Sequence, residues 1–128
     1  MARPAKWSDR VLAALAASRR HGLTLEELRR EIGHQGPAPE FSALYRAVEH
    51  LVGQGLVRRV ALPGRPARHE LAGHHHDHLL CTSCDRLVPV GCLAAGLDLA
   101  GLEGATGFAL SAHDIVLPGL CPDCRAAS

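Results

Sequence analysis

The sequence predicts an α+β protein in which an N-terminal winged helix-turn-helix is followed by a small α/β lobe stapled by a four-cysteine zinc site. Three observations predict this fold. Three helical patterns and a hairpin pattern fill residues 1–72, the composition changes at residues 72–74, and two Cys-x-x-Cys pairs lie within residues 73–128. Because three helices followed by a β-hairpin is the element order of a winged helix-turn-helix, we expect two domains, 1–72 and 73–128, joined by a hinge.

The first two helices are indicated by apolar spacing and by a capping signal. Trp7–Arg20 carries apolar residues at helical intervals and ends in arginines, which suit the negative end of a helix dipole. Thr24 and Glu27 have the spacing of a capping box, so a second helix should begin after Thr24 and end at Gly33.

The third helix is predicted over Glu40–Gln54. The residues expected to form its buried stripe are Phe41, Leu44, Val48, Leu51 and Val52. Gly55 suits the position after a helix, where a left-handed backbone is common. Leu56–Leu62 and Ala67–Leu71 then flank a turn at Pro63–Pro66, which predicts a hairpin.

The second half predicts a mixed lobe. Its expected elements are a strand at Arg86–Val90, a helix near Cys92–Leu102 and a long strand at Phe108–Leu117.

Composition limits the classes of protein that fit this chain. It has 128 residues, 47% of them hydrophobic but only 3% aromatic, so a folded core must be mainly aliphatic. Residues 1–72 carry a charge of +5 and residues 73–128 a charge of −4, which favours a polyanionic partner for the first half, although small domains often differ by a few charges. Without a membrane-length apolar run or a signal-peptide pattern, we expect a cytoplasmic protein with no membrane partner.

Two cysteine pairs predict a structural metal site. Cys81 with Cys84 and Cys121 with Cys124 offer four thiolates, the ligand set of a closed tetrahedral Zn²⁺ site, and reduced thiols are expected in the cytoplasm. The 36 residues between Cys84 and Cys121 exceed the usual zinc-ribbon spacing, so the intervening elements must fold back. The alternative is two redox-active or merely buried pairs, but a redox site would not need a second pair.

A histidine run, His74–His78, lies at the expected hinge. In an extended segment His74, His76 and His78 share one face, and His75 and Asp77 share the other. Histidines with a carboxylate such as Glu70 suit Fe²⁺, Mn²⁺, Co²⁺ or Zn²⁺. The alternative is a solvated loop that binds metal incidentally. His69 is a strand residue or a spare ligand, and His113 a core residue or a ligand.

The third helix and the hairpin offer groups for DNA. Ser42, Tyr45 and Arg46 lie at the start of the helix that would enter a major groove. The arginines expected to contact phosphates are Arg58, Arg59, Arg65 and Arg68. The alternative is that Tyr45 and Arg46 are ordinary surface residues.

Three segments resemble the ferric uptake regulator family. They are Ser42–Leu51 with Gly55–Val57, the run His74–Cys84, and Gly119–Cys124, in the family's order and approximate spacing over nearly the whole chain. The resemblance implies a homodimeric repressor whose winged helix binds palindromic, double-stranded operator DNA. It also implies that the C-terminal lobe dimerises and that one regulatory divalent metal per protomer, at the hinge, sets the DNA-reading geometry.

The resemblance also implies roles for single residues. Cys81, Cys84, Cys121 and Cys124 match the structural zinc ligands, and Tyr45 and Arg46 match the DNA-facing pair. Glu70, His76 and His78 match the sensor site, to which the family adds a histidine at the position of Gly22; His21 is its neighbour here.

A second metal site is expected to be weak or absent. His75 and Asp77 match half of it, but the matching carboxylate falls near Gly96 and the matching histidine at Leu120. Pro89 stands where peroxide-sensing and zinc-sensing relatives carry a carboxylate, which weakens the peroxide-sensing interpretation. Cys92 is an extra thiol, either a small buried hydrophobe or a sulfur ligand that would favour zinc.

These patterns together predict a metal-dependent repressor of metal-uptake or metal-homeostasis genes, with no enzymatic activity and no small-molecule substrate. Fe(II) or Mn(II) is the favoured signal, and zinc sensing is the alternative. A small zinc hydrolase and a zinc-ribbon interaction module are the rivals from other classes. The hydrolase lacks a general base beside a helical histidine motif, and neither rival explains the basic first half.

Overall fold

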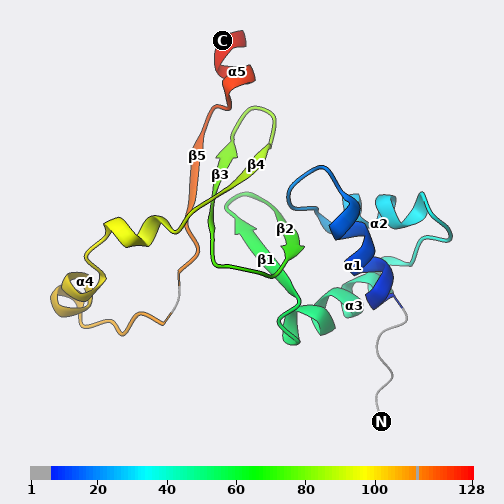
Figure 1. Cartoon of the computed structure of the whole chain (residues 1–128), viewed down its shortest axis with the longest axis horizontal. Coiled ribbons are helices and arrows are strands. Elements are labelled where there is room, and N and C mark those ends of the chain that lie inside the picture. Colours follow the sequence, from blue (N-terminus) through cyan, green and yellow to red (C-terminus); the bar gives the residue numbers. More distant parts are fainter. Residues whose placement is uncertain (1–6, 112) are drawn as a thin grey trace. The chain divides into compact units, whose positions relative to one another are not determined.

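The computed structural model describes residues 7–111 and 113–128 (Figure 1). The chain divides into two units, the first ending at Gly73 and the second beginning at His74. None of the helices in these described ranges is both long and apolar enough to cross a bilayer.

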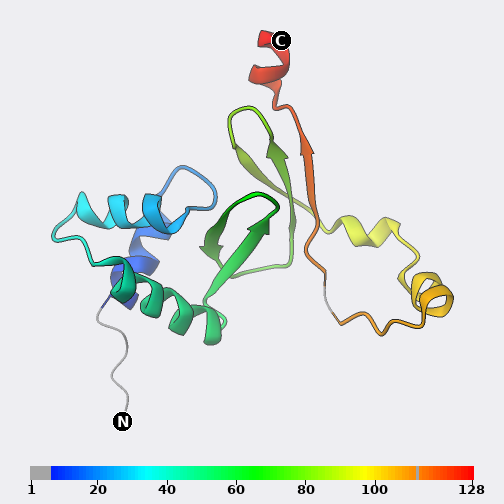
Figure 2. The same cartoon turned by 180° about the vertical axis from the view of Figure 1, so that it is seen from behind.

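The first unit contains three helices and a two-stranded antiparallel hairpin, as Figure 2 also shows. Its elements are α1 (Ser8–Ala17), α2 (Leu25–Gly33), α3 (Phe41–Gly53), β1 (Val57–Leu62) and β2 (Arg65–Leu71). Leu23 adds an isolated bridge to His69 of β2, so that the loop before α2 lies along the hairpin. This element order confirms the predicted winged helix-turn-helix.

Apolar residues of all three helices form the core of the first unit. Val11, Leu28, Leu44 and Leu51 are buried with at most 1% of their surface exposed. The capping box is present: Thr24 Oγ1 accepts from the Glu27 N–H at 3.1 Å, and the Thr24 N–H donates to Glu27 Oε1 at 3.0 Å. The helix therefore begins where the sequence predicts.

Two expectations for the helices were wrong in detail. The first helix ends at Ala17 rather than Arg20, because Ser18 leaves the helical region and the chain turns toward β2. Phe41 is half-exposed rather than buried, since it is the first residue of α3 and the guanidinium of Arg29 covers its ring at 5.1 Å. Ala47 is buried on this helix instead.

The second unit is built around a three-stranded sheet with strand order β4-β3-β5. Its elements are β3 (Asp77–Cys81), β4 (Leu87–Val90), the 3₁₀ helix η1 (Leu93–Gly96), α4 (Leu99–Thr106), β5 (Val116–Gly119) and α5 (Pro122–Ala127). The central strand β3 pairs antiparallel with β4 and parallel with β5. Because parallel neighbours need a crossover, η1 and α4 carry the chain from one edge of the sheet to the other.

Two predicted elements of this unit were wrong. A continuous helix near Cys92–Leu102 is replaced by η1 and α4, because Asp98 caps a new helix by accepting from the Gly101 N–H at 2.9 Å. The strand predicted at Phe108–Leu117 is only Val116–Gly119, since β3 offers four paired positions on that side. Ala112, within the predicted strand, lies outside the described residues.

Candidate metal centres

Four cysteine thiols converge in the second unit. Cys81 ends β3, Cys84 follows in the next turn, and Cys121 and Cys124 belong to the start and body of α5. Their four sulfur atoms lie within 4.8 Å of one another, and those of Cys84 and Cys121 are 3.8 Å apart. Zn–S bonds of about 2.3 Å in a tetrahedron place sulfurs roughly 3.8 Å apart, so the cluster has the dimensions of a zinc site.

Backbone donors and crowding set the ionisation of these thiols. The Cys121 N–H donates to Cys81 Sγ at 3.3 Å, and together with the Cys84 N–H it lowers the pKa of Cys81 to about 6. The Ser83 hydroxyl acts to lower the pKa of Cys124, but the neighbouring thiols raise it to about 12. Four adjacent thiols therefore cannot all ionise by themselves, and a divalent cation would offset their mutual repulsion.

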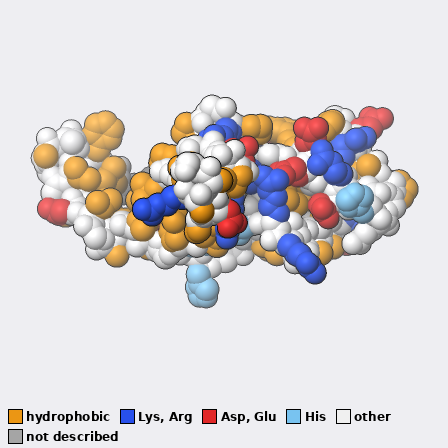
Figure 3. Space-filling model, turned by 90° about the horizontal axis from the view of Figure 1, so that it is seen from above, with side chains coloured by type: hydrophobic (Ala, Val, Ile, Leu, Met, Phe, Trp, Pro, Cys, Tyr) orange, Lys and Arg blue, Asp and Glu red, His pale blue; other side chains and the backbone are white. Residues whose placement is uncertain are grey.

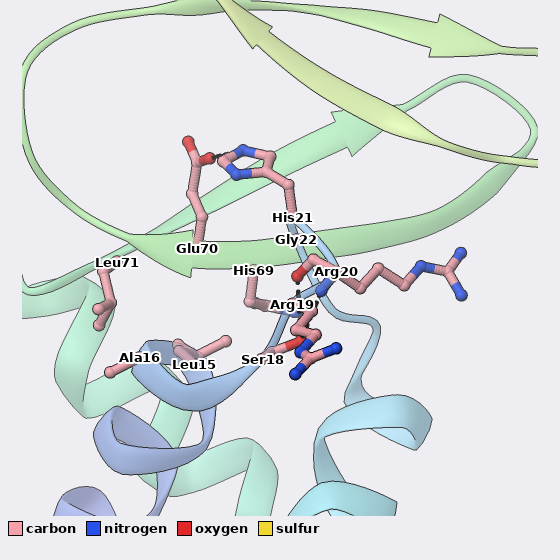
Figure 4. Close-up of a pocket in the computed structure, with 10 residues that line it drawn as sticks. All are labelled: Leu15, Ala16, Ser18, Arg19, Arg20, His21, Gly22, His69, Glu70 and Leu71. Atoms are coloured by element: carbon pink, nitrogen blue, oxygen red, sulfur yellow. Dashed lines mark hydrogen bonds and ion pairs between the residues drawn. The ribbon is translucent and has the colours of Figure 1, made fainter. Parts of the chain in front are cut away.

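The first unit places His21 against Glu70, as Figure 4 shows. The His21 Nε2 and Glu70 Oε2 atoms are 2.5 Å apart, and only 4% of the Glu70 side chain is exposed. Gly22 follows with φ of +73°, a left-handed conformation that residues with a Cβ rarely adopt. The glycine makes the turn, and the residue before it carries the imidazole to Glu70.

His69 and Arg68 have structural roles in the same strand. His69 is buried and its Nδ1–H donates to the Leu23 carbonyl at 2.9 Å, while burial lowers its pKa, so the spare-ligand interpretation of His69 is wrong. Arg68 is also buried and donates to the Gly22 carbonyl at 3.3 Å. The expectation that Arg68 contacts phosphates is therefore wrong.

The second unit brings His76 and His78 together. Their ring centroids are 4.7 Å apart, and His78 is buried at the start of β3. His76 Nδ1–H donates to the His74 carbonyl at 2.9 Å, which orients the ring. The two imidazoles thus lie on one side of the segment, as strand alternation requires.

The other side of the same segment carries a third group of donors, made by His75, Asp77, Cys92 and His113, whose donor atoms all lie within 4.8 Å of one another. The Nε2 atoms of His75 and His113 are 2.8 Å apart, and Cys92 Sγ is 3.4 Å from His113 Nε2. Asp77 is fully buried. Burial acts to raise its pKa, but the N–H donors of Leu93 and Ile115 and the nearby imidazoles lower it below its ordinary value.

Sequence reasoning left His113 and Cys92 as possible ligands but assigned neither of them to this group. The resemblance placed the histidine at Leu120, which is exposed, and the carboxylate near Gly96; the structure has His113 and Cys92 beside Asp77 instead. The interpretation of Cys92 as a buried hydrophobe was wrong, because it is exposed. The useful signal is the parallel register His78↔Val116, which extends backward to place position 75 opposite 113.

Of the residues expected to contact DNA, those on α3 are exposed, and two arginines of the hairpin lie beside carboxylates. Ser42, Tyr45 and Arg46 are exposed on α3. Arg58 lies 3.9 Å from Glu70 and Arg59 is paired with Glu49, while Arg65 begins β2 beside the hairpin turn.

Comparisons with known proteins agree with one another. The mycobacterial transcriptional regulator FurA (Mycobacterium tuberculosis) is 34% identical over 83 residues, which are 64% of this chain and 56% of that protein. The match thus spans about half the length of FurA. The Legionella pneumophila ferric uptake regulation protein is 28% identical over 117 residues, covering 91% of this chain and 86% of that protein.

Solved structures share the fold. The ferric uptake regulator of Helicobacter pylori, described as having three functional metal-binding sites, superposes with a TM-score of 0.78 at 21% identity and covers 96% of this chain and 82% of its own. A zinc uptake regulator in complex with zinc and DNA gives a TM-score of 0.73 at 21% identity, and the alignment covers 98% of this chain and 85% of that one. The profile of the ferric uptake regulator family matches residues 4–117. This chain therefore belongs to the ferric uptake regulator family.

Proposed function

We propose that this protein is a metal-dependent, DNA-binding transcriptional repressor of genes for metal uptake or metal homeostasis, and that it acts as a homodimer. The observation that carries the proposal is the placement of paired metal donors on either side of the hinge. His21 and Glu70 are paired in the first unit, and His76 and His78 in the second.

The four donors are proposed to bind one exchangeable ion. Five residues separate Glu70 from His76, so the linking chain holds the two pairs within about 20 Å of each other at full extension. Three imidazoles and a carboxylate suit Fe(II) or Mn(II), the favoured signals, and this set lacks the thiolate that would make zinc the clear choice. Zinc sensing remains the alternative within the same family.

A second ion, Zn(II), is proposed at Cys81, Cys84, Cys121 and Cys124. Four thiolates complete a tetrahedron and leave no open position, so this site stabilises the second unit rather than sensing or reacting.

The DNA partner is supported by the exposed face of α3. Tyr45 is 52% exposed and Arg46 lies beside it, where the helix of a helix-turn-helix motif enters a major groove. The zinc uptake regulator named above shares this fold in a complex with DNA. Arg58 and Arg59 would have to leave their carboxylate partners to reach phosphates. Arg65, at the start of β2 beside the hairpin turn, is a further candidate for a contact with the DNA backbone.

Homodimerisation is supported by the apolar surface of the second unit. Helix α4 buries none of its residues, and Figure 3 shows hydrophobic side chains over the part of the second unit that carries it, at the left of the view. The exposed large apolar residues there are Leu97, Leu102, Phe108 and Leu110. Several large apolar side chains exposed in one part of a fold are typical of an interface, and a second copy would cover them.

The proposed switch is thermodynamic linkage. An ion that binds ligands of both units in one arrangement stabilises that arrangement, which in the dimer would match two successive major grooves. A tenfold change in operator affinity requires only about 1.4 kcal/mol of differential metal binding.

Operator-binding titrations with Fe²⁺, Mn²⁺ and Zn²⁺ at one fixed salt concentration test this proposal. We expect His76→Ala and His78→Ala to abolish the metal dependence of DNA binding while the dimer persists, because each removes a sensor ligand. His34→Ala, which changes an exposed histidine outside every donor group, is the matched control. Equal operator affinity of metal-free and metal-loaded protein would refute the switch.

The rival functions give different outcomes. A zinc-ribbon interaction module would show no DNA affinity that changes with metal, and a zinc hydrolase would turn over simple esters or amides. The curated relatives are named as regulators, which favours the repressor over both.

A further inference from the structure

We propose that Cys92 makes the second metal site, formed by His75, Asp77, Cys92 and His113, select a thiophilic divalent cation of the zinc class over Mn²⁺ or Fe²⁺. The inference rests on the proposed function in treating the protein as a metal-binding regulator, and what it adds is the role of Cys92 in choosing the ion. It concerns residues of the second unit alone.

The spacing of the donor atoms fits one ion. Tetrahedral bonds of about 2.0–2.1 Å to nitrogen or oxygen and about 2.3 Å to sulfur place neighbouring donors roughly 3.3–3.6 Å apart. The Cys92 Sγ to His113 Nε2 distance is 3.4 Å, and the Asp77 oxygens lie 3.6 Å from His75 Nε2 and 3.7 Å from His113 Nε2. Of these four atom pairs, the two imidazole nitrogens, at 2.8 Å, are the pair that would have to separate, by a few tenths of an ångström.

Asp77 holds the site together from inside the fold. Its Oδ2 accepts from the Leu93 N–H at 2.7 Å, which fixes the segment that begins with Cys92. Its Oδ1 accepts from the Ile115 N–H at 3.0 Å, which fixes the segment that carries His113. Since each carboxylate oxygen has two acceptor positions, a hydrogen bond to each leaves capacity for an ion. Hydrogen bonds of Asp77 therefore tie together the three separate segments that carry these donors.

The thiol decides which ion this site prefers. Two imidazoles and a carboxylate accept most first-row divalent ions, whereas a thiolate adds affinity for zinc, cobalt and copper and little for manganese. Cys92 is exposed, so solvent and ions can reach its sulfur, and it lies apart from the four cysteines of the other cluster. Among the residues that the structure describes, the group that contains His76 and His78 has no sulfur donor, so the two sites would respond to different metals.

Cobalt spectroscopy tests the assignment. The 128-residue chain, with zinc retained in the four-cysteine site and thiols kept reduced, is titrated with Co²⁺ while its zinc content is measured. We expect thiolate-to-cobalt charge-transfer absorption with the intensity of one thiolate, lost in Cys92→Ser and His113→Ala and kept in His76→Ala. The last variant separates this inference from the proposed sensor, because it disables the sensor alone.

Competition between metals provides the second measurement. We expect Cys92→Ser to weaken Zn²⁺ binding at this site at least about tenfold while Mn²⁺ binding changes by less than about threefold. Cys92→Asp, which exchanges the thiolate for a carboxylate, should shift the preference toward Mn²⁺. An unchanged cobalt spectrum or unchanged zinc affinity of the second site in Cys92→Ser would overturn the proposal. Retention of zinc by the four-cysteine site, together with native circular dichroism, confirms that the variants are folded.

Discussion

Gly22 shows how a single residue positions a candidate ligand. Its φ of +73° lets the chain turn immediately after His21 and brings that imidazole to Glu70. A side chain at this position strains the backbone by about 1–2 kcal/mol. The sequence alone could not choose between His21 and His69 as the fourth sensor ligand, because the choice depends on the direction of this turn and on the hydrogen bond that His69 donates to Leu23.

We expect Gly22→Ala to lower the free energy of unfolding by about 1–2 kcal/mol and to weaken regulatory metal binding, because the turn must relax and displace His21. Urea denaturation and Mn²⁺ titration measure the two effects. Gly73→Ala is the control, since nothing lies within 4 Å of its added Cβ and its φ is not positive. Equal stability of the two variants would show that the turn at position 22 does not require glycine.

Asp77 is a second residue whose replacement should change the stability of the fold by a predictable amount. Asparagine keeps one acceptor oxygen but turns an amide N–H₂ toward a backbone N–H, so either Leu93 or Ile115 loses its partner. We expect Asp77→Asn to destabilise the metal-free second unit by about 1–3 kcal/mol, measured by hydrogen exchange of the β3 and β5 amides. Asp114→Asn, at an exposed position, should change the exchange little.

At the scale of elements, the N-terminus of α2 is the clearest case of local sequence determining structure. Thr24 and Glu27 satisfy each other's backbone N–H groups, and the helix begins at Leu25 as the sequence predicts. We expect Thr24→Ala to lower the free energy of unfolding by about 1 kcal/mol, because the side-chain acceptor for the Glu27 N–H is lost. Thermal denaturation measures the change, and Thr24→Ser should recover most of it; a loss that serine does not recover would argue for another cause.

Elements with local signals were predictable, and elements defined by distant partners were not. The hairpin β1–β2 and the three helices follow from apolar spacing, a capping box and glycines. The pattern of Phe108–Leu117 predicts one long strand. The observed strand β5 is short because its length is set by pairing with β3, which lies more than thirty residues away in the chain. For the same reason the sequence could not bring His113 to Asp77: their proximity is a property of the parallel register.

At the scale of the whole molecule, the two units differ in what stabilises them. Among the described residues, thirteen apolar side chains, Pro39 included, are buried in the first unit, whereas those buried in the second are Leu80, Cys81, Leu87 and Ala94. So small a core rarely stabilises a fold without a metal or another cross-link. The four-cysteine cluster, which joins the end of β3 to α5, supplies that stabilisation when zinc is bound.

We therefore expect Cys84→Ser to release zinc and to unfold the second unit while α1–α3 stay folded. Amide chemical-shift dispersion, measured by NMR for residues 74–128 and separately for the first unit, reports the two outcomes. Cys92→Ser is the matched control, since it removes a thiol outside the four-cysteine cluster and should retain both the zinc of that cluster and the dispersion, whatever it does to metal at the second group. Full dispersion in zinc-free Cys84→Ser would contradict a structural role for the ion.

The apolar surface of α4 leads to a prediction about assembly. Leu102 is 50% exposed and Phe108 is 69% exposed, so charged residues at these positions cost little in a monomer but much in a buried interface. We expect the double variant Leu102→Asp, Phe108→Asp to sediment as a monomer at concentrations where the parent is a dimer. Leu56→Asp, at a comparably exposed leucine of the first unit, should leave the sedimentation coefficient unchanged.

Strand β3 and the histidine run before it have a consequence for how this gene can change. Donors for two proposed ions point to opposite sides of one segment, in strict alternation, and the strand then ends at Cys81 of the four-cysteine cluster. Adding or deleting one codon between the histidine run and that cysteine would move each ligand set to the opposite face of the segment. Adding two codons would return both sets to their original faces. The parity of the residue count in this segment is therefore as much a part of the metal chemistry as the identity of the side chains.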